Sequence, residues 1–170
     1  GDTSSITELL DLGQIPKRVT HNDAKLNNLM IDDQTGEGIC ILDLDTVMPG
    51  SVLYDFGDMV RSMAALAPED EPDCSKAGFS MPVFEVLTHG YLEAARDFIT
   101  PLEIDHLAIA GRLITLEQAI RFLGDYINGD VYYKTVRPDH NLDRARTQIT
   151  MLIQMESKYE QMLSVIAKYR

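Results

Sequence analysis

Short apolar runs of the length of β-strands, separated by polar turns, occur only in the first third of the chain. Two short apolar runs, residues 29–31 and 38–42, are separated by the polar segment 32–36, which ends in glycine. Short apolar runs joined by a polar, glycine-containing turn predict a β-hairpin. Residues 18–21 are compatible with a further short strand, and 49–50 (Pro-Gly) with a turn. The hairpin is the only convincing β signal in the sequence.

Beyond this region, the apolar positions recur with the spacing of helices. Asp55 and Ser80 are placed to cap two of them, and Thr100 with Glu103 forms a capping box that is followed by proline at the first helical position. The helix that this box opens is apolar on most faces, so we expect it to be the buried central helix. Besides a short helix within residues 1–16, the expected helices cover residues 55–66, 80–92, 100–123 and 141–170. The predicted fold class is therefore mainly α with a small β-hairpin.

Two stretches lack either spacing. Residues 68–79 are rich in proline and acidic residues and predict a mobile surface loop, with Glu69 and Asp70 in solvent. Residues 124–140 contain two glycines and a proline and predict a connection between helices.

Composition narrows the class of protein. A chain of 170 residues with 45% hydrophobic residues suits one folded domain that needs no disulfide or metal to hold it together. The net charge of −12 argues against binding to nucleic acid or to an anionic membrane, since both partners select basic surfaces. The sequence has no cationic, apolar leader and no apolar stretch of about 20 residues, so we expect a cytoplasmic protein.

The two cysteines do not form a disulfide framework. Cys40 lies in the apolar run 38–42 and is expected to be a small buried hydrophobic residue, as free cysteines commonly are. This usage is typical of a reducing compartment.

The polar residues that could carry chemistry lie at both ends of the predicted hairpin. Asp23 precedes the first strand, Asn28 lies at its start, and Asp43 follows the second strand. Antiparallel pairing brings the strand ends that carry Asn28 and Asp43 together. A carboxylate and an amide oxygen at one place are ligands that suit Mg²⁺, and Asp23 nearby could accept the proton of an attacking hydroxyl. The pattern predicts phosphoryl transfer of the kinase type.

With His21-x-Asp23-x-x-x-x-Asn28 and Ile41-Leu-Asp-Leu-Asp45, the chain resembles the aminoglycoside phosphotransferase/choline kinase-like family, whose members have the protein kinase fold. The segments 43–50, 54–58 and 137–146 look most like those of N-acetylhexosamine 1-kinases. The resemblance implies an ATP- and Mg²⁺-dependent enzyme that phosphorylates the anomeric hydroxyl of an N-acetylated amino sugar.

The resemblance also implies roles for individual residues. Asp23 would be the catalytic base, and Lys25 would meet the γ-phosphate, as the corresponding lysine does in many protein kinases. The metal ligands would be Asn28 and Asp43, with Asp45 supporting them or binding a second metal ion. The residues expected to hold the sugar are Asp58, Arg61, Arg137 and His140.

Two other motifs could mislead. Asp55-Phe56-Gly57 spells the metal-binding motif of protein kinases, but it opens a helix instead of closing a strand. We therefore assign the metal to Asp43 and expect Asp55 to cap the helix and brace the catalytic loop. Residues 41–46 also resemble the nucleophile motif of haloacid-dehalogenase-type phosphatases. That fold requires strands and helices to alternate after the motif, whereas this sequence predicts helices only, so we disfavour the phosphatase.

The sequence before His21 has no glycine-rich loop and no strand lysine that could cover the ATP phosphates. We therefore expect residues 1–170 to be the C-terminal lobe of a larger kinase, inactive alone and without its nucleotide-binding N-terminal lobe. Within it, residues 17–48 would form the catalytic loop and metal-binding hairpin, and residues 52–170 the helical substrate-binding part. Two alternatives stay open, namely another small acceptor (aminoglycoside, homoserine or choline) and a non-catalytic helical interaction domain.

Overall fold

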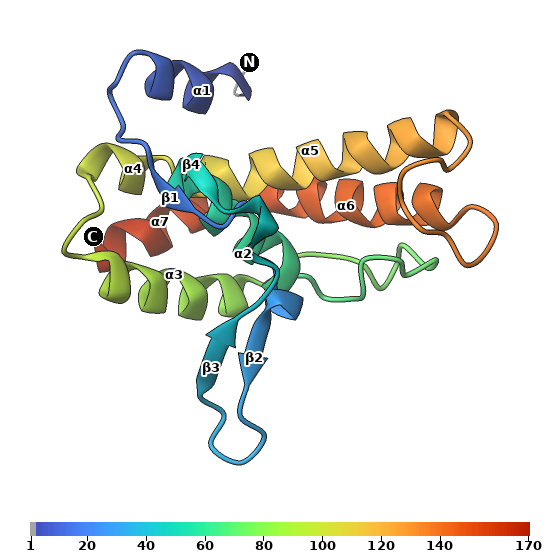
Figure 1. Cartoon of the computed structure of the whole chain (residues 1–170), viewed down its shortest axis with the longest axis horizontal. Coiled ribbons are helices and arrows are strands. Elements are labelled where there is room, and N and C mark those ends of the chain that lie inside the picture. Colours follow the sequence, from blue (N-terminus) through green and yellow to red (C-terminus); the bar gives the residue numbers. More distant parts are fainter. Residues whose placement is uncertain (1–2) are drawn as a thin grey trace.

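The computed structural model describes residues 3–170 and shows a helical body from which one β-hairpin projects (Figure 1). A short helix, α1 (Thr3–Asp11), precedes four short strands: β1 (Arg18–Thr20), β2 (Leu29–Ile31), β3 (Gly38–Ile41) and β4 (Met48–Gly50). Single 3-10 turns, η1 (Leu26–Asn28) and η2 (Leu44–Thr46), precede β2 and follow β3. The remaining helices are α2 (Val52–Met63), α3 (Met81–Ala95), α4 (Pro101–Asp105), α5 (Leu107–Ile127), α6 (His140–Ser157) and α7 (Tyr159–Tyr169). The mainly helical fold with small antiparallel sheets confirms the predicted class.

The predicted hairpin is confirmed, and a second sheet lies beside it. Strands β2 and β3 pair antiparallel, with Leu29 opposite Ile41. The Pro49-Gly50 turn, however, is wrong, because these residues lie in β4, which pairs with β1. A Cβ on Gly50 would lie 2.4 Å from the Thr20 hydroxyl oxygen, so the close approach of the two strands requires glycine there. Pairing between segments so far apart in sequence leaves no local signal.

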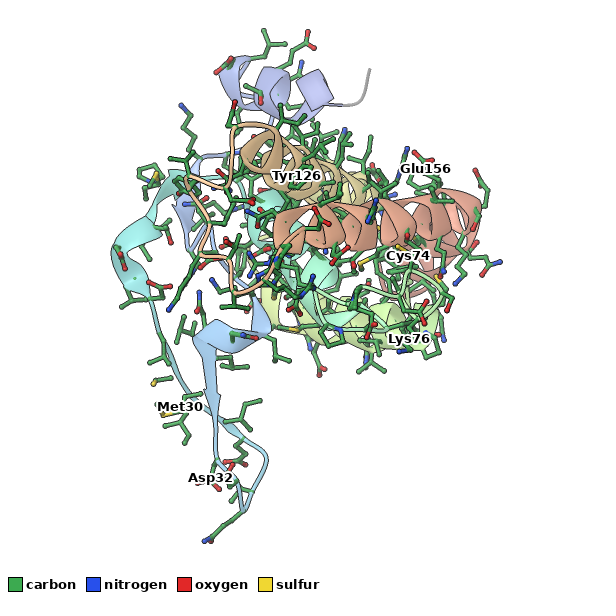
Figure 2. The ribbon with its side chains drawn as sticks, turned by 90° about the vertical axis from the view of Figure 1, so that its right-hand side faces the viewer. Met30, Asp32, Cys74, Lys76, Tyr126 and Glu156 are labelled. Atoms are coloured by element: carbon green, nitrogen blue, oxygen red, sulfur yellow. The ribbon has the colours of Figure 1, made fainter. Side chains whose placement is uncertain are left out.

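Cys40 is exposed, which corrects the expectation that it is buried. The reason is the position of the hairpin, which extends away from the helices and leaves apolar residues of both strands exposed. Figure 2 shows Met30 and Asp32 on this projecting segment, far from the helical body. An apolar strand is buried only if another element covers it, and the strand sequence does not show whether one does.

Helix α5 is the centre of the fold, as predicted, and α2 and α6 pack along it (Figure 1). The crossing of α2 and α5 is tight because glycines lie at the contact. A Cβ on Gly57 would approach the carbonyl oxygen of Ala110 to 2.5 Å, and one on Gly111 would approach Val60 to 3.0 Å. Phe56 is fully buried here, so the Asp-Phe-Gly triplet belongs to the helical core. After β4 the described residues form helices and loops without strand–helix alternation, which argues against the phosphatase fold.

Helix ends differ from the sequence prediction in three places. Ser51, not Asp55, caps α2, since its hydroxyl accepts the backbone N–H of Leu53. The helix expected over 100–123 divides at His106, whose ring Nδ1 bonds the carbonyl oxygen of Leu102 at 2.7 Å. The last helix divides at Lys158, whose ammonium group donates to the carbonyl oxygen of Phe79 at 3.0 Å. The caps at Ser80 and Thr100 are confirmed.

Among the described residues, none of the helices combines the length and apolar character that crossing a lipid bilayer would require.

Candidate active site

The loop between β1 and β2, which the sequence predicts to be the catalytic loop, presents Asp23. The Lys25 ammonium group donates to Asp23 Oδ2 at 2.6 Å, and Asn28 Nδ2 donates to the same oxygen at 2.8 Å. Asn28 Nδ2 also donates to the backbone carbonyl of Asp23 at 2.8 Å. The 3-10 turn η1 makes this possible, because it folds the chain back so that Asn28 reaches a residue five positions earlier. The side-chain hydrogen bonds from Lys25 and Asn28 are both accepted by Asp23 Oδ2, and Oδ1 accepts neither of them.

The pKa of Asp23 reflects two opposing effects. Partial burial raises the pKa of this carboxyl group, and the hydrogen bonds from Lys25 and Asn28 lower it by more. The net result is a pKa below the ordinary value of an aspartate. Asp23 is therefore ionised at neutral pH and can accept a hydrogen bond or a proton from a bound hydroxyl group.

Asp55 holds the loop from the first turn of α2. Its carboxylate accepts the backbone N–H of His21 at 2.8 Å and that of Asn22 at 2.7 Å. Asn22 has a φ of 61°, a left-handed conformation that asparagine tolerates better than most residues. Asp55 thus fixes the backbone immediately before Asp23, which agrees with the bracing role predicted for it.

A second set of bonds joins the catalytic loop to the segment that follows β3. Asn22 Nδ2 donates to the carbonyl oxygen of Thr46 at 3.0 Å, and the Thr46 hydroxyl donates to the carbonyl oxygen of His21 at 2.7 Å. The backbone N–H of Leu42 donates to the carbonyl oxygen of Asn28 at 2.8 Å. These bonds bring Asn28 and Asp43, the residue after Leu42, to the same end of the hairpin, as the sequence predicted.

Asp43 and Asp45 lie on this segment and interact with each other. The Asp45 carboxylate raises the pKa of Asp43 above its ordinary value, because it accepts a hydrogen bond from the protonated form of Asp43 and its charge disfavours the ionised form. A divalent cation would relieve this repulsion, and the two carboxylates with the Asn28 amide oxygen are the oxygen ligands that Mg²⁺ accepts. Within residues 3–170, no group of three or more His, Cys, Asp or Glu side chains is arranged to hold a metal. If Mg²⁺ binds at Asn28, Asp43 and Asp45, water and phosphate oxygens would have to complete its shell.

A cleft of about 1020 Å³ opens beside Asp23, between α2, α5, α6 and two loops. Tyr54, Asp58 and Arg61 come from α2, while the α5 residues include Glu117, Gln118 and Arg121. Five acidic and five basic side chains line it, so the lining is formally neutral although the whole chain carries −12. The acidic residues are Asp23, Asp58, Glu69, Asp70 and Glu117, and the basic residues are Lys25, Arg61, Arg121, Lys134 and Arg144.

Asp58 and Arg61, both predicted to hold the substrate, form a buried ion pair at the cleft wall. Arg61 Nη2 lies 2.8 Å from Asp58 Oδ1, and Arg61 Nη1 lies 2.6 Å from Glu69 Oε1. Burial raises the pKa of Asp58 more than the Arg61 charge lowers it. Asp58 Oδ2 is buried and has no hydrogen-bond partner in the part of the chain that the structure describes.

Arg137 and His140, the other two predicted substrate residues, lie outside the cleft lining. Arg137 pairs with Asp143 and donates to the carbonyl oxygen of Asp70 at 2.6 Å. His140 Nδ1 accepts the backbone N–H of Val136 at 3.2 Å, so its Nε2 carries the proton and donates to Asp70 Oδ2 at 3.0 Å. Both side chains therefore hold Asp70, which does line the cleft.

Several cleft residues were not found by sequence reasoning. Glu69 and Asp70 belong to the loop predicted to be a solvated surface segment, and the structure instead places both in the cleft lining. Tyr132 and Tyr133 come from the connection after α5, which Asp125 organises by accepting the backbone N–H groups of residues 131, 132 and 133. These hydrogen bonds, that of Tyr133 foremost, lower the pKa of Asp125. The remaining missed residues include Gln118, Arg121, Arg144 and Gln148.

The structure thus places Asp23 at a cleft, beside the hairpin end that carries Asn28 and Asp43. The family model of the phosphotransferase enzyme family matches residues 4–96, which include the catalytic loop, the hairpin and α2. The chain belongs to this family, and the predicted family is confirmed. Membership identifies it as a phosphotransferase of small-molecule substrates and implies ATP as the phosphoryl donor.

Proposed function

We propose that this protein transfers the γ-phosphoryl group of ATP to the anomeric hydroxyl of an N-acetylhexosamine, with Asp23 as the base. The observation that carries the proposal is the position of the Asp23 carboxylate. It lies at the cleft, fixed by Lys25 and Asn28 through one oxygen, beside the hairpin end that carries Asp43.

In this mechanism the acceptor hydroxyl donates a hydrogen bond to the Asp23 carboxylate. Its oxygen attacks the γ-phosphorus, the bond to the bridging oxygen of ADP breaks, and the hydroxyl proton passes to Asp23. Lys25 keeps the carboxylate ionised and orients it. When bound at Asn28, Asp43 and Asp45, Mg²⁺ would neutralise charge on the phosphate oxygens.

The charge of the cleft supports a neutral acceptor. A polycationic aminoglycoside or the choline cation would select an excess of acidic groups, whereas acidic and basic side chains are equal in number here. The cleft also contains the rings of Tyr54, Tyr132 and Tyr133, which offer flat apolar faces to the C–H groups of a sugar ring. Together these features favour a sugar over the cationic acceptors, aminoglycosides and choline.

We further propose that the 170 residues form the C-terminal lobe, with residues 17–48 as the catalytic and metal-binding part and 52–170 as the acceptor-binding part. The exposed hairpin supports this view. Leu29 is 36% exposed and its partner Ile41 60%, and an uncovered two-stranded hairpin is at best marginally stable in water. A nucleotide-binding lobe would cover these residues.

Phosphoryl transfer from radiolabelled ATP tests the proposal. With the nucleotide-binding lobe joined, the protein should phosphorylate N-acetylglucosamine or N-acetylgalactosamine, and Asp23→Asn should reduce the rate by about 10²–10⁴-fold. The matched control is Asp33→Asn, at an exposed position in the hairpin turn, which should leave the rate unchanged.

Wild-type turnover by Asp23→Asn would show that Asp23 is not the base. Activity with homoserine, choline or an aminoglycoside, but not with hexosamines, would refute the acceptor assignment. Robust transfer by the 170 residues alone would refute the need for a second lobe.

A further inference from the structure

Gln148 is a buried glutamine in α6 whose amide oxygen has no hydrogen-bond partner within the part of the chain that the structure describes. The residue is 2% exposed and lines the cleft. Among residues 3–170, its Oε1 atom and Asp58 Oδ2 are both buried side-chain acceptors of the cleft without a hydrogen bond. Native proteins pair nearly all such atoms, because leaving one unpaired opposes folding. An exception at a cleft wall indicates that the partner is a ligand.

A second glutamine on the same helix shows the ordinary arrangement. Gln154 Oε1 accepts the backbone N–H of Phe79 at 3.0 Å, and its Nε2 donates to the carbonyl oxygen of Ala77 at 3.5 Å. Gln154 thus ties the loop that precedes α3 to α6 and lies outside the cleft lining. The helix itself therefore does not account for the unpaired oxygen of Gln148.

We propose that Gln148 and Asp58 form a specificity subsite that receives hydrogen-bond donors of the acceptor sugar, its hydroxyl or amide N–H groups. This inference rests on the proposed function and names two residues that select the sugar. Arg61 donates hydrogen bonds to Asp58 Oδ1 and Glu69 Oε1, so Asp58 Oδ2 remains free to accept one from the ligand. The two unpaired atoms that define the subsite are both acceptors, and an anionic group placed there would meet the Asp58 carboxylate. It therefore selects a neutral, donor-bearing molecule.

Stability and binding separate this role from a structural one. Gln148→Leu removes an unpaired polar atom at nearly constant size, so the melting temperature of the free protein should stay the same or rise. Its affinity for N-acetylglucosamine, measured by ligand-observed NMR on the 170-residue chain, should fall about tenfold. The control Gln154→Leu removes paired atoms, and it should lower the melting temperature without changing affinity.

A set of monodeoxy N-acetylglucosamines identifies the group that Gln148 binds. One monodeoxy sugar should bind the wild-type protein about tenfold more weakly than N-acetylglucosamine does. The Gln148→Leu variant should bind this monodeoxy sugar and N-acetylglucosamine with equal affinity. Asp58→Asn keeps the side-chain volume and replaces one acceptor oxygen by an amide donor. This change should weaken the binding of N-acetylglucosamine more than the binding of one other monodeoxy sugar, the one that lacks the group bound by Asp58.

The outcomes distinguish this proposal from the proposed function. If the sugar binds but Gln148→Leu keeps the wild-type affinity, or destabilises the fold as Gln154→Leu does, the subsite is refuted and the kinase assignment stands. If neither N-acetylglucosamine nor N-acetylgalactosamine binds the wild-type chain, both the sugar acceptor and the subsite are refuted.

Discussion

Asp55 Oδ1 accepts the backbone N–H of Asn22 at 2.7 Å, although 33 residues separate them in sequence. Its Oδ2 takes the neighbouring N–H of His21 at 2.8 Å. One side chain in the first turn of α2 thus fixes the backbone that carries the proposed base. Stability of α2 and geometry at Asp23 are therefore coupled.

Replacing Asp55 by alanine should lower the stability of the fold and disturb the geometry at Asp23. The change leaves two backbone N–H groups without their charged acceptor, and hydrogen bonds to charged groups contribute about 1.5–3 kcal/mol each. We expect a lower melting temperature and a larger fall in kcat than in acceptor affinity. Calorimetry and steady-state kinetics check this. A variant that melts lower but keeps kcat would show that the loop holds its geometry without Asp55.

Replacing Lys25 by methionine should shift the acid limb of the pH–rate profile to higher pH. Asp23 works as a base only when ionised, and the Lys25 hydrogen bond helps to keep the pKa of Asp23 below its ordinary value. Losing that bond raises this pKa, so activity is lost at a higher pH as the solution is acidified. Lys25→Arg keeps the charge and should retain the wild-type limb. An unshifted limb in Lys25→Met would contradict the pairing.

The same shift predicts how stability depends on pH. Because the folded-state pKa of Asp23 lies below the ordinary value of 3.8, its ionised form stabilises the fold above that pH. This contribution is lost as the pH falls through the lowered pKa. It should be smaller in Lys25→Met than in the wild type.

Arg61→Met should destabilise the fold by about 3–5 kcal/mol at neutral pH, as expected when one member of a buried ion pair is removed. The Arg61 side chain is 8% exposed and neutralises both Asp58 and Glu69. The loss should be smaller near pH 4.5. Burial raises the pKa of Asp58 in the folded state, so protonation of Asp58 stabilises the folded state relative to the unfolded one. This stabilisation is present at low pH and is lost as the pH rises through the raised pKa. Denaturant unfolding at both pH values measures the effect, and an equal loss at each would contradict it.

His140→Ala should release the loop that carries Asp70. We expect faster amide hydrogen exchange over residues 69–78 and a higher KM for the acceptor. Asp70→Ala should have the same effect, and the double variant should add little, since the two residues act through one hydrogen bond. Fully additive effects on KM would instead support the direct sugar contact of His140 predicted from the sequence.

Cys40 should react with a thiol reagent in the native 170-residue chain at nearly the rate of a free cysteine, because it is exposed. Cys74 is half-buried and should react more slowly. Single Cys→Ser variants assign the two phases. If Cys40 reacted only after denaturation, the hairpin would be covered in solution and the exposed position described above would be wrong.

The sequence by itself determined what depends on neighbours along the chain. The capping box at Thr100, the hairpin and the approach of Asn28 to Asp23 all involve residues a few positions apart, where chain geometry leaves few choices. The class of chemistry followed from such local spacing. The same spacing misplaced the cap of α2, because Asp55 was judged as a helix-start residue and its carboxylate is used by a distant loop.

Only the tertiary structure decided which distant segments share the cleft. Gln148 joins the wall because α6 packs along α5 and α5 along α2, and helix packing depends on the shapes of whole faces. The burial of Cys40 was likewise undetermined, since a strand of apolar residues is covered only when another element reaches it. Arg137 and His140 were predicted from the sequence to hold the sugar, and the structure instead places both against Asp70, outside the cleft lining.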